Sequence, residues 1–300
     1  MKRFSTIIDD VREQFGVWFG RALIVLVLLF IFFIAGGGVS HKSKWRILHV
    51  NVIGASAVPA DEVRALVMDK ILGNYFLVYA RNNSYLFPIG EINQALLSTF
   101  PRIASVSVER VDEHTITINI SERKPYALWC GLPATAYRSN EADTRWQAGG
   151  KQIVKDCWFI DETGFIFDKA PEFSKGVYME IYGKLVEKIP GEPLRASVPF
   201  DRFVTANAFA KLLNDKVGKP YLISLKPEGE LEVTIFTSSK YPFLADTTIR
   251  IKDESTPETL LKNLLSAIPV QFPNNVIPIK KLQYIDMRFG NKVIFGFENS

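Results

Sequence analysis

The feature that most constrains the fold is an uncharged apolar run near the N-terminus. Residues Ala22 to Val39 form 18 consecutive positions without a charge, dominated by Leu, Ile, Val and Phe. At about 1.5 Å of rise per residue, a helix of this length nearly spans the hydrocarbon layer of a bilayer. A buried core helix is the alternative, but nothing polar interrupts the stretch from Leu23 to Ile34. The run therefore predicts a transmembrane helix over residues 22–39.

A cleaved signal peptide is the competing interpretation of this run, because the small residues Ala35 to Gly38 follow its apolar part. The preceding segment favours retention. Residues 1–21 are long for the basic region of a signal peptide, contain Asp9, Asp10 and Glu13, and place apolar residues at helical spacing. We expect a cytoplasmic segment over residues 1–21 that forms an interfacial helix and leads into the anchor.

Basic residues flank the apolar run on both sides, so their count barely discriminates between the two orientations. The short N-terminal segment cannot fold into a domain alone. A long C-terminal domain translocates largely regardless of its charge. We therefore expect a single-pass plasma-membrane protein with a cytoplasmic N-terminus and an extracytoplasmic part of about 260 residues.

Charge and cysteine content narrow the functional classes. The formal net charge is +4 and lacks the clustered basic face of a nucleic-acid-binding protein, so we expect no nucleic-acid partner. Cys130 and Cys157 both follow the anchor, and each adjoins an aromatic, strand-like run. In an oxidising compartment this pair predicts a disulfide. Two separate buried thiols are the alternative.

The first part of the exported chain, residues 45–125, has the pattern strand, helix, helix, strand, strand. Apolar residues alternate with polar ones in the strand segments and recur at helical spacing in the helical ones. Three strands and two helices in so short a segment form one small sheet with the helices on a single face. The expected strands are 45–54, 106–108 and 116–120, and the expected helices are 59–71 and 89–100.

Residues 126–300 predict a second unit, a mixed and mostly antiparallel β-sheet with helices, so the fold class of the chain is α+β. One helix is expected after a capping Asp201 and is closed by Gly218 and Pro220. A second is opened by Thr256 and Pro257. The expected strands are 155–160, 165–168, 221–226, 231–237, 247–251, 281–288 and 292–297.

A search for catalytic chemistry finds no candidate. None of the three histidines has metal-ligand spacing or a neighbouring nucleophile motif. The acid pairs Asp112-Glu113 and Asp161-Glu162 fall in predicted hairpin turns, where we interpret them as solvated carboxylates. No phosphate-binding loop, nucleophile elbow or zinc-protease motif occurs. We expect no catalytic residue, no metal site and no cofactor.

The C-terminal hairpin is the most distinctive feature, because its strands are rich in aromatic residues up to Phe297. A last strand at a sheet edge offers unpaired backbone groups to a partner strand, with aromatic side chains as anchors. The alternative is that these aromatics belong to the core. The sequence leaves both interpretations open.

Several motifs, taken in order, resemble the FtsQ/DivIB family of bacterial cell-division proteins. The resemblance extends over essentially the whole chain. The motifs are Val50–Gly54, Phe100–Ile103, Val108–Arg110, Ser121–Pro125, Trp158–Phe167 and Ile285–Arg288. It implies a POTRA-like domain over residues 45–125 and an FtsQ-type β domain over residues 126–300.

The same resemblance implies a non-enzymatic scaffold of the divisome at the division septum, which recruits and regulates partners in septal peptidoglycan synthesis. The expected partners are FtsB/FtsL-like membrane-anchored coiled-coil proteins, together with septal peptidoglycan synthase components. In the family, terminal strands pair with FtsB. Carried over by position, the interface would contain Arg288, Phe289, Asn291, Phe295 and Phe297.

Two features depart from the family pattern: the cysteine pair and a long loop over residues 131–150. The loop motivates an alternative function, a membrane-tethered exported enzyme acting on the envelope. A pocket that gathers His114 with carboxylates would favour that alternative. A generic adhesion or envelope-spacing module is a third candidate, distinguished by failure to concentrate at division sites.

Overall fold

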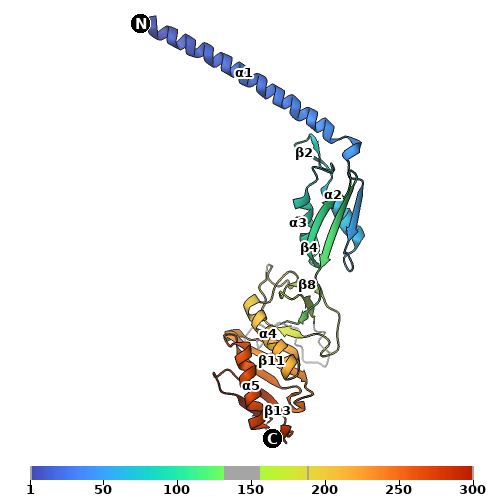
Figure 1. Cartoon of the computed structure of the whole chain (residues 1–300), viewed down its shortest axis with the longest axis vertical. Coiled ribbons are helices and arrows are strands. Elements are labelled where there is room, and N and C mark those ends of the chain that lie inside the picture. Colours follow the sequence, from blue (N-terminus) through green and yellow to red (C-terminus); the bar gives the residue numbers. More distant parts are fainter. Residues whose placement is uncertain (1, 132–155, 188, 299–300) are drawn as a thin grey trace. The chain divides into compact units, whose positions relative to one another are not determined.

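A computed structural model of the chain describes residues 2–131, 156–187 and 189–298, with side chains from Trp18 onward (Figure 1). The chain divides into two compact units, residues 1–122 and 123–300. The division lies three residues before the boundary of 125/126 expected from the sequence. The two units are described separately below.

The first unit begins with a single long helix, α1 (Lys2–Ser40). The sequence predicted an interfacial helix followed by an anchor over 22–39, whereas α1 runs through both segments without a break. No proline interrupts it, and the three consecutive glycines Gly36–Gly38 near its end do not terminate it. The segment Trp18–Ser40 has a mean hydropathy of 2.9 and is the one helix in the described residues that could span a membrane by length and composition.

The rest of the first unit is a three-stranded sheet with strand order β1-β5-β4 and two helices. Strand β1 (His49–Ile53) runs parallel to β5 (Thr115–Glu122), and β4 (Ile103–Arg110) pairs antiparallel with β5. Buried residues of α2 (Ala60–Lys70) and α3 (Ile89–Thr99) share one apolar core with the sheet. The predicted order of strand, helix, helix, strand, strand is confirmed.

Two local details of this unit differ from the sequence-based prediction. The first strand begins at His49 rather than at Trp45, because Ser43–Trp45 form a short 3₁₀ turn, η1. The segment between α2 and α3, where no strand was expected, contains a small antiparallel hairpin of β2 (Asn74–Tyr75) and β3 (Tyr79–Ala80). Strands of two residues are too short to show an alternation of apolar and polar side chains in the sequence.

The second unit is a nine-stranded mixed sheet with strand order β14-β13-β12-β11-β10-β9-β6-β7-β8. Most neighbouring strands are antiparallel, as predicted, and three pairs are parallel: β12 with β13, β9 with β10, and β6 with β9. The strands are β6 (Ala127–Trp129), β7 (Trp158–Ile160), β8 (Ile166–Lys169), β9 (Glu180–Tyr182), β10 (Lys219–Leu225), β11 (Glu230–Thr237), β12 (Thr248–Lys252), β13 (Leu282–Asp286) and β14 (Ile294–Phe297).

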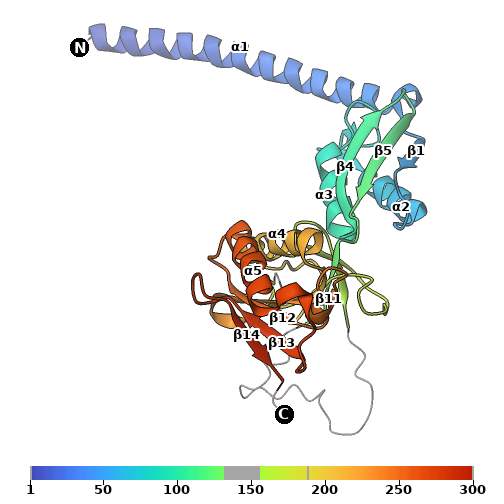
Figure 2. The ribbon, with the colours of Figure 1, turned by 60° about the horizontal axis from the view of Figure 1, so that its bottom comes forward.

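The two long helices of this unit, α4 (Phe200–Lys216) and α5 (Pro257–Gln271), lie on the same side of the strands β11 to β14 (Figure 2). Their apolar residues and alternate residues of the strands form one core, because side chains alternate between the two faces of a strand. Fully or almost fully buried members include Phe203, Phe209, Leu213, Leu260, Leu264, Ile268, Ile223, Val233, Ile249 and Ile285.

The predicted helix signals of α4 were partly wrong. Asp201 is not the N-cap, because the helix starts one residue earlier and Pro199 occupies the cap position without a side-chain cap bond. Asp201 lies instead in the first turn, where a carboxylate interacts favourably with the helix dipole. Gly218 does follow the last turn and donates to the Leu213 carbonyl at 2.8 Å. Pro220 belongs to β10, next to register shifts in its pairing with β11.

Asp161 is only 8% exposed, so its interpretation as a solvated turn carboxylate was wrong. Its oxygens accept bonds from the Thr163 hydroxyl at 2.6 Å, from the Thr163 and Phe165 amides at 2.8 and 3.1 Å, and from Arg123. Burial alone raises the pKa of Asp161, but these hydrogen bonds outweigh it and the net pKa is lowered. Asp161 therefore holds the β7–β8 turn against the start of the second unit.

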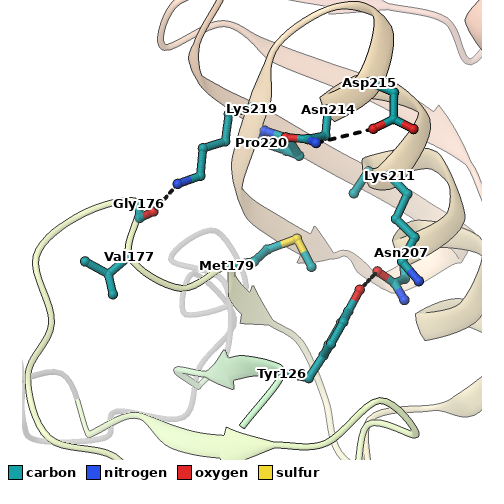
Figure 3. Close-up of a pocket in the computed structure, with 11 residues that line it drawn as sticks. Tyr126, Gly176, Val177, Met179, Asn207, Lys211, Asn214, Asp215, Lys219 and Pro220 are labelled. Atoms are coloured by element: carbon teal, nitrogen blue, oxygen red, sulfur yellow. Dashed lines mark hydrogen bonds between the residues drawn. The ribbon is translucent and has the colours of Figure 1, made fainter.

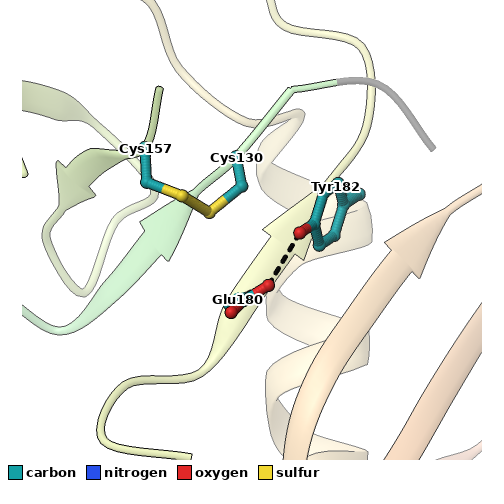
Figure 4. The surroundings of a disulfide bond; sticks show 4 residues. All are labelled: Cys130, Cys157, Glu180 and Tyr182. Atoms are coloured by element: carbon teal, nitrogen blue, oxygen red, sulfur yellow. Dashed lines mark hydrogen bonds between the residues drawn. A yellow bond between two sulfur atoms is a disulfide. The ribbon is translucent and has the colours of Figure 1, made fainter. Parts of the chain in front are cut away.

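Cys130 and Cys157 form a disulfide next to the β6–β7 pair (Figure 4). Trp129 of β6 lies opposite Trp158 of β7, which places the two adjoining cysteines across from each other. The neighbouring strand β9 contains Glu180 and Tyr182, whose side chains are joined by a hydrogen bond of 2.7 Å. Most of the predicted 131–150 loop lies outside the described residues.

Candidate functional site

The candidate site is the free edge of the nine-stranded sheet. Strand β14 is the terminal strand and pairs antiparallel with β13 alone among the described strands. The Glu298 amide donates inward to the Lys281 carbonyl at 2.9 Å. Because inward and outward groups alternate along a strand, the backbone N–H groups of Phe295 and Phe297 point away from β13. The edge thus presents unpaired backbone groups of the kind that another strand can bind.

Phe295 and Phe297 lie on the side of β14 that faces the end of α5. Their ring centroids are 5.4 and 6.2 Å from that of Phe272, which itself packs at 4.3 Å against Phe243. Both rings are half-buried against the main core. The sequence left a core role and an anchoring role open for these aromatics. Their position combines the two, because they hold the edge strand in place and still expose part of each ring.

The other face of the edge is formed by Tyr284 and Gly296. The two residues are opposite each other in the β13–β14 register. A Cβ atom at residue 296 would lie 2.2 Å from the Tyr284 ring, so only glycine fits under it. The guanidinium carbon of Arg250 lies 4.2 Å from the centroid of the same ring, at cation–π distance. Tyr284 is therefore held between Arg250 and the backbone of β14.

The Arg288 guanidinium pairs with carboxylates of its own sheet. Its Nε and Nη2 donate to the two carboxylate oxygens of Asp286 at 2.9 and 2.6 Å, and its Nη1 donates to Glu230 at 2.6 Å. The hydrogen bonds from the Arg288 side chain lower the pKa of Asp286, which is 5% exposed. Arg288, one of the predicted interface residues, therefore holds the end of β13 in place, and its charge is already paired within the sheet.

Phe289 and Asn291 lie in the turn between β13 and β14 and are exposed. The Phe289 ring is 55% exposed, and the Arg288 guanidinium lies 5.7 Å from its centroid. The Asn291 side-chain oxygen accepts a hydrogen bond of 3.4 Å from Asn263 of α5. The structure therefore gathers all five predicted residues in one hairpin, with only Phe289 and Asn291 fully at its surface.

The sequence reasoning did not single out Ile294. It lies at the start of β14, on the face opposite Phe295, and is 45% exposed. Its alternation with Phe295 and Phe297 was the available signal, because an aliphatic residue on the outer face of an edge strand has no core to enter. We call Phe289, Ile294 and the backbone of Phe295 to Phe297 the C-terminal edge.

A pocket of 370 Å³ provides the test of the enzymatic alternative (Figure 3). It is lined by parts of α4, the start of β10 and the turn before β9, and holds Lys211, Asp215 and Lys219. His114 is not among its residues and lies in the β4–β5 turn, where Nδ1 is 2.9 Å from the Arg46 carbonyl oxygen. The pocket therefore does not gather His114 with carboxylates.

The first unit can be assigned by comparison with known families. Residues 45–123 match the family described as "POTRA domain, FtsQ-type". The chain carries an FtsQ-type POTRA domain. The match covers β1 through β5 and ends one residue after Glu122, the last residue of that unit. A search of the curated proteins found no match.

The POTRA domain confirms the resemblance to the FtsQ/DivIB family that the motifs indicated. Together with the apolar helix α1, it fits a single-pass membrane protein of cell division. FtsQ-type POTRA proteins are generally non-enzymatic, and the domain indicates a scaffold role. The C-terminal edge lies outside the matched residues.

Proposed function

We propose that this protein is a non-enzymatic scaffold of the divisome. Helix α1 anchors it in the plasma membrane, with the N-terminus in the cytoplasm and the POTRA domain and the nine-stranded sheet outside. At the division septum the exported units recruit and regulate partners in septal peptidoglycan synthesis, first among them FtsB/FtsL-like membrane-anchored coiled-coil proteins. The FtsQ-type POTRA domain supports the cell-division role, and the C-terminal edge supports the mode of partner binding.

The observation that carries the binding mode is that β14 pairs with β13 alone among the described strands. A strand that pairs on one side only presents unpaired N–H and C=O groups, and natural proteins usually protect such an edge. Here neither proline nor a charged side chain interrupts Ile294–Phe297. The edge is also held firmly, because Phe295 and Phe297 contact Phe272 and Tyr284 packs over Gly296. A rigid, unprotected edge suits the addition of an extended segment from a partner.

The exposed apolar residues around this edge indicate what kind of partner segment would bind there. Phe289 and Ile294 are 55% and 45% exposed and flank the free backbone of β14. A partner segment that pairs with β14 would cover both side chains with apolar residues of its own. Backbone pairing supplies affinity in this mode, and the flanking side chains supply specificity.

A matched pair of substitutions at residue 297 tests the binding mode. Phe297→Pro removes the outward N–H of β14, and proline is tolerated at a strand edge where no internal bond is lost. Phe297→Ala removes the same ring but keeps the N–H. We expect the full-length Phe297→Pro protein to lose binding to the FtsB-like partner, and Phe297→Ala to weaken it only. Binding would be measured by co-purification from membranes.

Thermal unfolding of the two variants serves as the control, since both lose the contact with Phe272 and should melt at similar temperatures. If Phe297→Pro binds the partner as well as Phe297→Ala does, the partner does not use the backbone of β14, and the proposed binding mode is wrong.

A further inference from the structure

The β2–β3 hairpin of the POTRA domain exposes two large apolar side chains at its tip. Phe76 is 83% exposed and Leu77 is 93% exposed. Both have positive φ, +48° and +64°, and the Val78 amide donates to the Tyr75 carbonyl at 3.0 Å to close the turn. Consecutive positive φ values favour Asn and Gly, because a bulky side chain is strained there. Turn formation therefore does not explain why Phe and Leu occupy this tip.

The same hairpin is fastened to the C-terminal end of α1. The Tyr79 hydroxyl donates to the Phe33 carbonyl at 3.0 Å, and the two rings meet edge to face with centroids 5.0 Å apart. The Ala80 amide donates to the Ser40 hydroxyl at 3.0 Å. A Cβ atom at residue 37 would lie 2.0 Å from a methyl group of Val78, so Gly37 is what allows the hairpin to approach the helix.

These contacts fix the height of the hairpin relative to the bilayer. Phe33 precedes Ser40 by seven residues, which places its carbonyl about 10 Å below the end of the helix. The apolar segment Trp18–Ser40 has 23 residues. Its length of about 35 Å exceeds a hydrocarbon layer of roughly 30 Å by only a few ångströms. The Tyr79 ring, which reaches the Phe33 carbonyl, therefore lies at the level of the hydrocarbon.

We propose that the tip of the β2–β3 hairpin, Phe76 with Leu77, inserts into the lipid of the leaflet that surrounds the C-terminal end of α1. The POTRA domain then contacts the membrane at two points, the helix and the hairpin. This inference rests on α1 spanning the membrane, as in the proposed function.

The groups around the hairpin agree with this placement. Leu72, just before the hairpin, is 64% exposed and extends the apolar surface. The nearby charge of Arg81 is neutralised by Glu91 at 2.5 Å, and its guanidinium lies 5.0 Å from the Tyr75 ring centroid. Trp45 and Tyr85 pack edge to face at 6.4 Å and belong to the same unit. Tryptophan and tyrosine are the aromatic residues enriched at membrane interfaces.

Site-directed spin labelling of the full chain in pure lipid vesicles tests the insertion. The chain has two cysteines, both in the disulfide, so one added cysteine can be labelled under non-reducing conditions. The three variants are Leu77→Cys at the hairpin tip, Ile53→Cys as an aqueous control and Leu28→Cys as a membrane reference. Ile53 is a matched control because it is also exposed, at 58%, and lies at the end of β1 away from His49.

Collision rates with oxygen, which dissolves in lipid, are compared with those of a water-soluble nickel chelate. We expect the ratio of oxygen to nickel collisions to be several-fold higher at residue 77 than at residue 53 and to lie between the values at residues 53 and 28, because this ratio rises with depth and Leu28 lies nearer the middle of the apolar segment. A ratio at residue 77 equal to that at residue 53, with residue 28 in lipid, would overturn the hairpin insertion and leave the anchor standing. A water-exposed label at residue 28 would contradict both the membrane-spanning α1 and the hairpin insertion.

Discussion

At the residue scale, charged side chains next to each other in the sequence hold different parts of the molecule. Glu122 closes the POTRA domain by accepting the amides of Ser56 and Val58 at 2.6 and 2.9 Å. Arg123, the next residue, pairs with Asp161 and begins the second unit. The Ser121–Pro125 motif therefore combines two separate anchoring points in neighbouring positions.

The motifs within residues 45–125 predicted the POTRA domain correctly, but no motif indicated that Asp161 is buried. Its turn context predicts a solvated carboxylate, since Asp is common in turns. Asp161 can be buried because its carboxylate pairs with Arg123. Arg123 is 38 residues earlier in the chain and reaches the β7–β8 turn only in the folded unit. A contact between residues so distant in sequence leaves no periodic signal. The ion pair of Arg288 with Glu230, 58 residues earlier, was not predictable for the same reason, and the role of Arg288 in partner binding stays a prediction.

Replacing Arg288 with methionine should destabilise the second unit. Asp286 is 5% exposed and would lose two charge-assisted hydrogen bonds. Leaving a buried carboxylate without its donor costs about 2 to 3 kcal/mol in the free energy of unfolding. Denaturant unfolding of the detergent-solubilised chain measures this loss. The double variant Asp286→Asn/Arg288→Met is the control and should recover part of it; an Arg288→Met protein as stable as wild type would contradict the assignment.

The loss of unfolding free energy in the Arg288→Met protein should also depend on pH. Because the folded-state pKa of Asp286 is lowered, its ion pair stabilises the fold above the unfolded-state pKa of about 3.9. That stabilisation is lost as the pH falls below this value and through the folded-state pKa. The stability difference between wild type and Arg288→Met should be full at neutral pH and shrink in this acidic range. A difference that stays constant down to the acid transition would mean that Asp286 is not the group concerned.

At the element scale, long periodic segments were predictable and pairings between distant strands were not. The alternation in 231–237 predicted β11 to within a residue, and Thr256 with Pro257 predicted the start of α5. Nothing in the pattern shows that β9 lies between β6 and β10, because that order depends on contacts distant in sequence. The terminal strand was predicted as a possible edge, and β14 does lie at the end of the sheet.

The disulfide is a second element-scale feature with a measurable effect. It joins residues 27 positions apart in the sequence, at the β6–β7 pair. Closing a loop of this length lowers the entropy of the unfolded chain and stabilises the fold by about 3 to 4 kcal/mol. We expect the Cys130→Ser/Cys157→Ser protein to lose this amount in denaturant unfolding under oxidising conditions.

A reducing agent should shift the unfolding midpoint of the wild-type protein toward that of the double serine variant. The variant itself serves as the control, because reductant should leave its midpoint unchanged. Equal stability of both proteins under oxidising conditions would show that the pair does not constrain the unfolded chain.

At the scale of the whole molecule, the features with functional implications lie in both units. The first unit combines an apolar helix that could span a membrane with an FtsQ-type POTRA domain. The second presents the C-terminal edge on its nine-stranded sheet. A helix that could span a membrane, an FtsQ-type POTRA domain and an edge strand at the end of the described sheet are the observations on which the proposed scaffold role rests.

The most direct test of this account is the position of the protein in dividing cells. A fluorescent protein fused to the N-terminus would be imaged in cells of the source organism in which the native copy can be depleted. The account predicts a band at midcell before constriction, and filamentous cells when the protein is depleted. Uniform envelope fluorescence together with normal division after depletion would contradict the role in division.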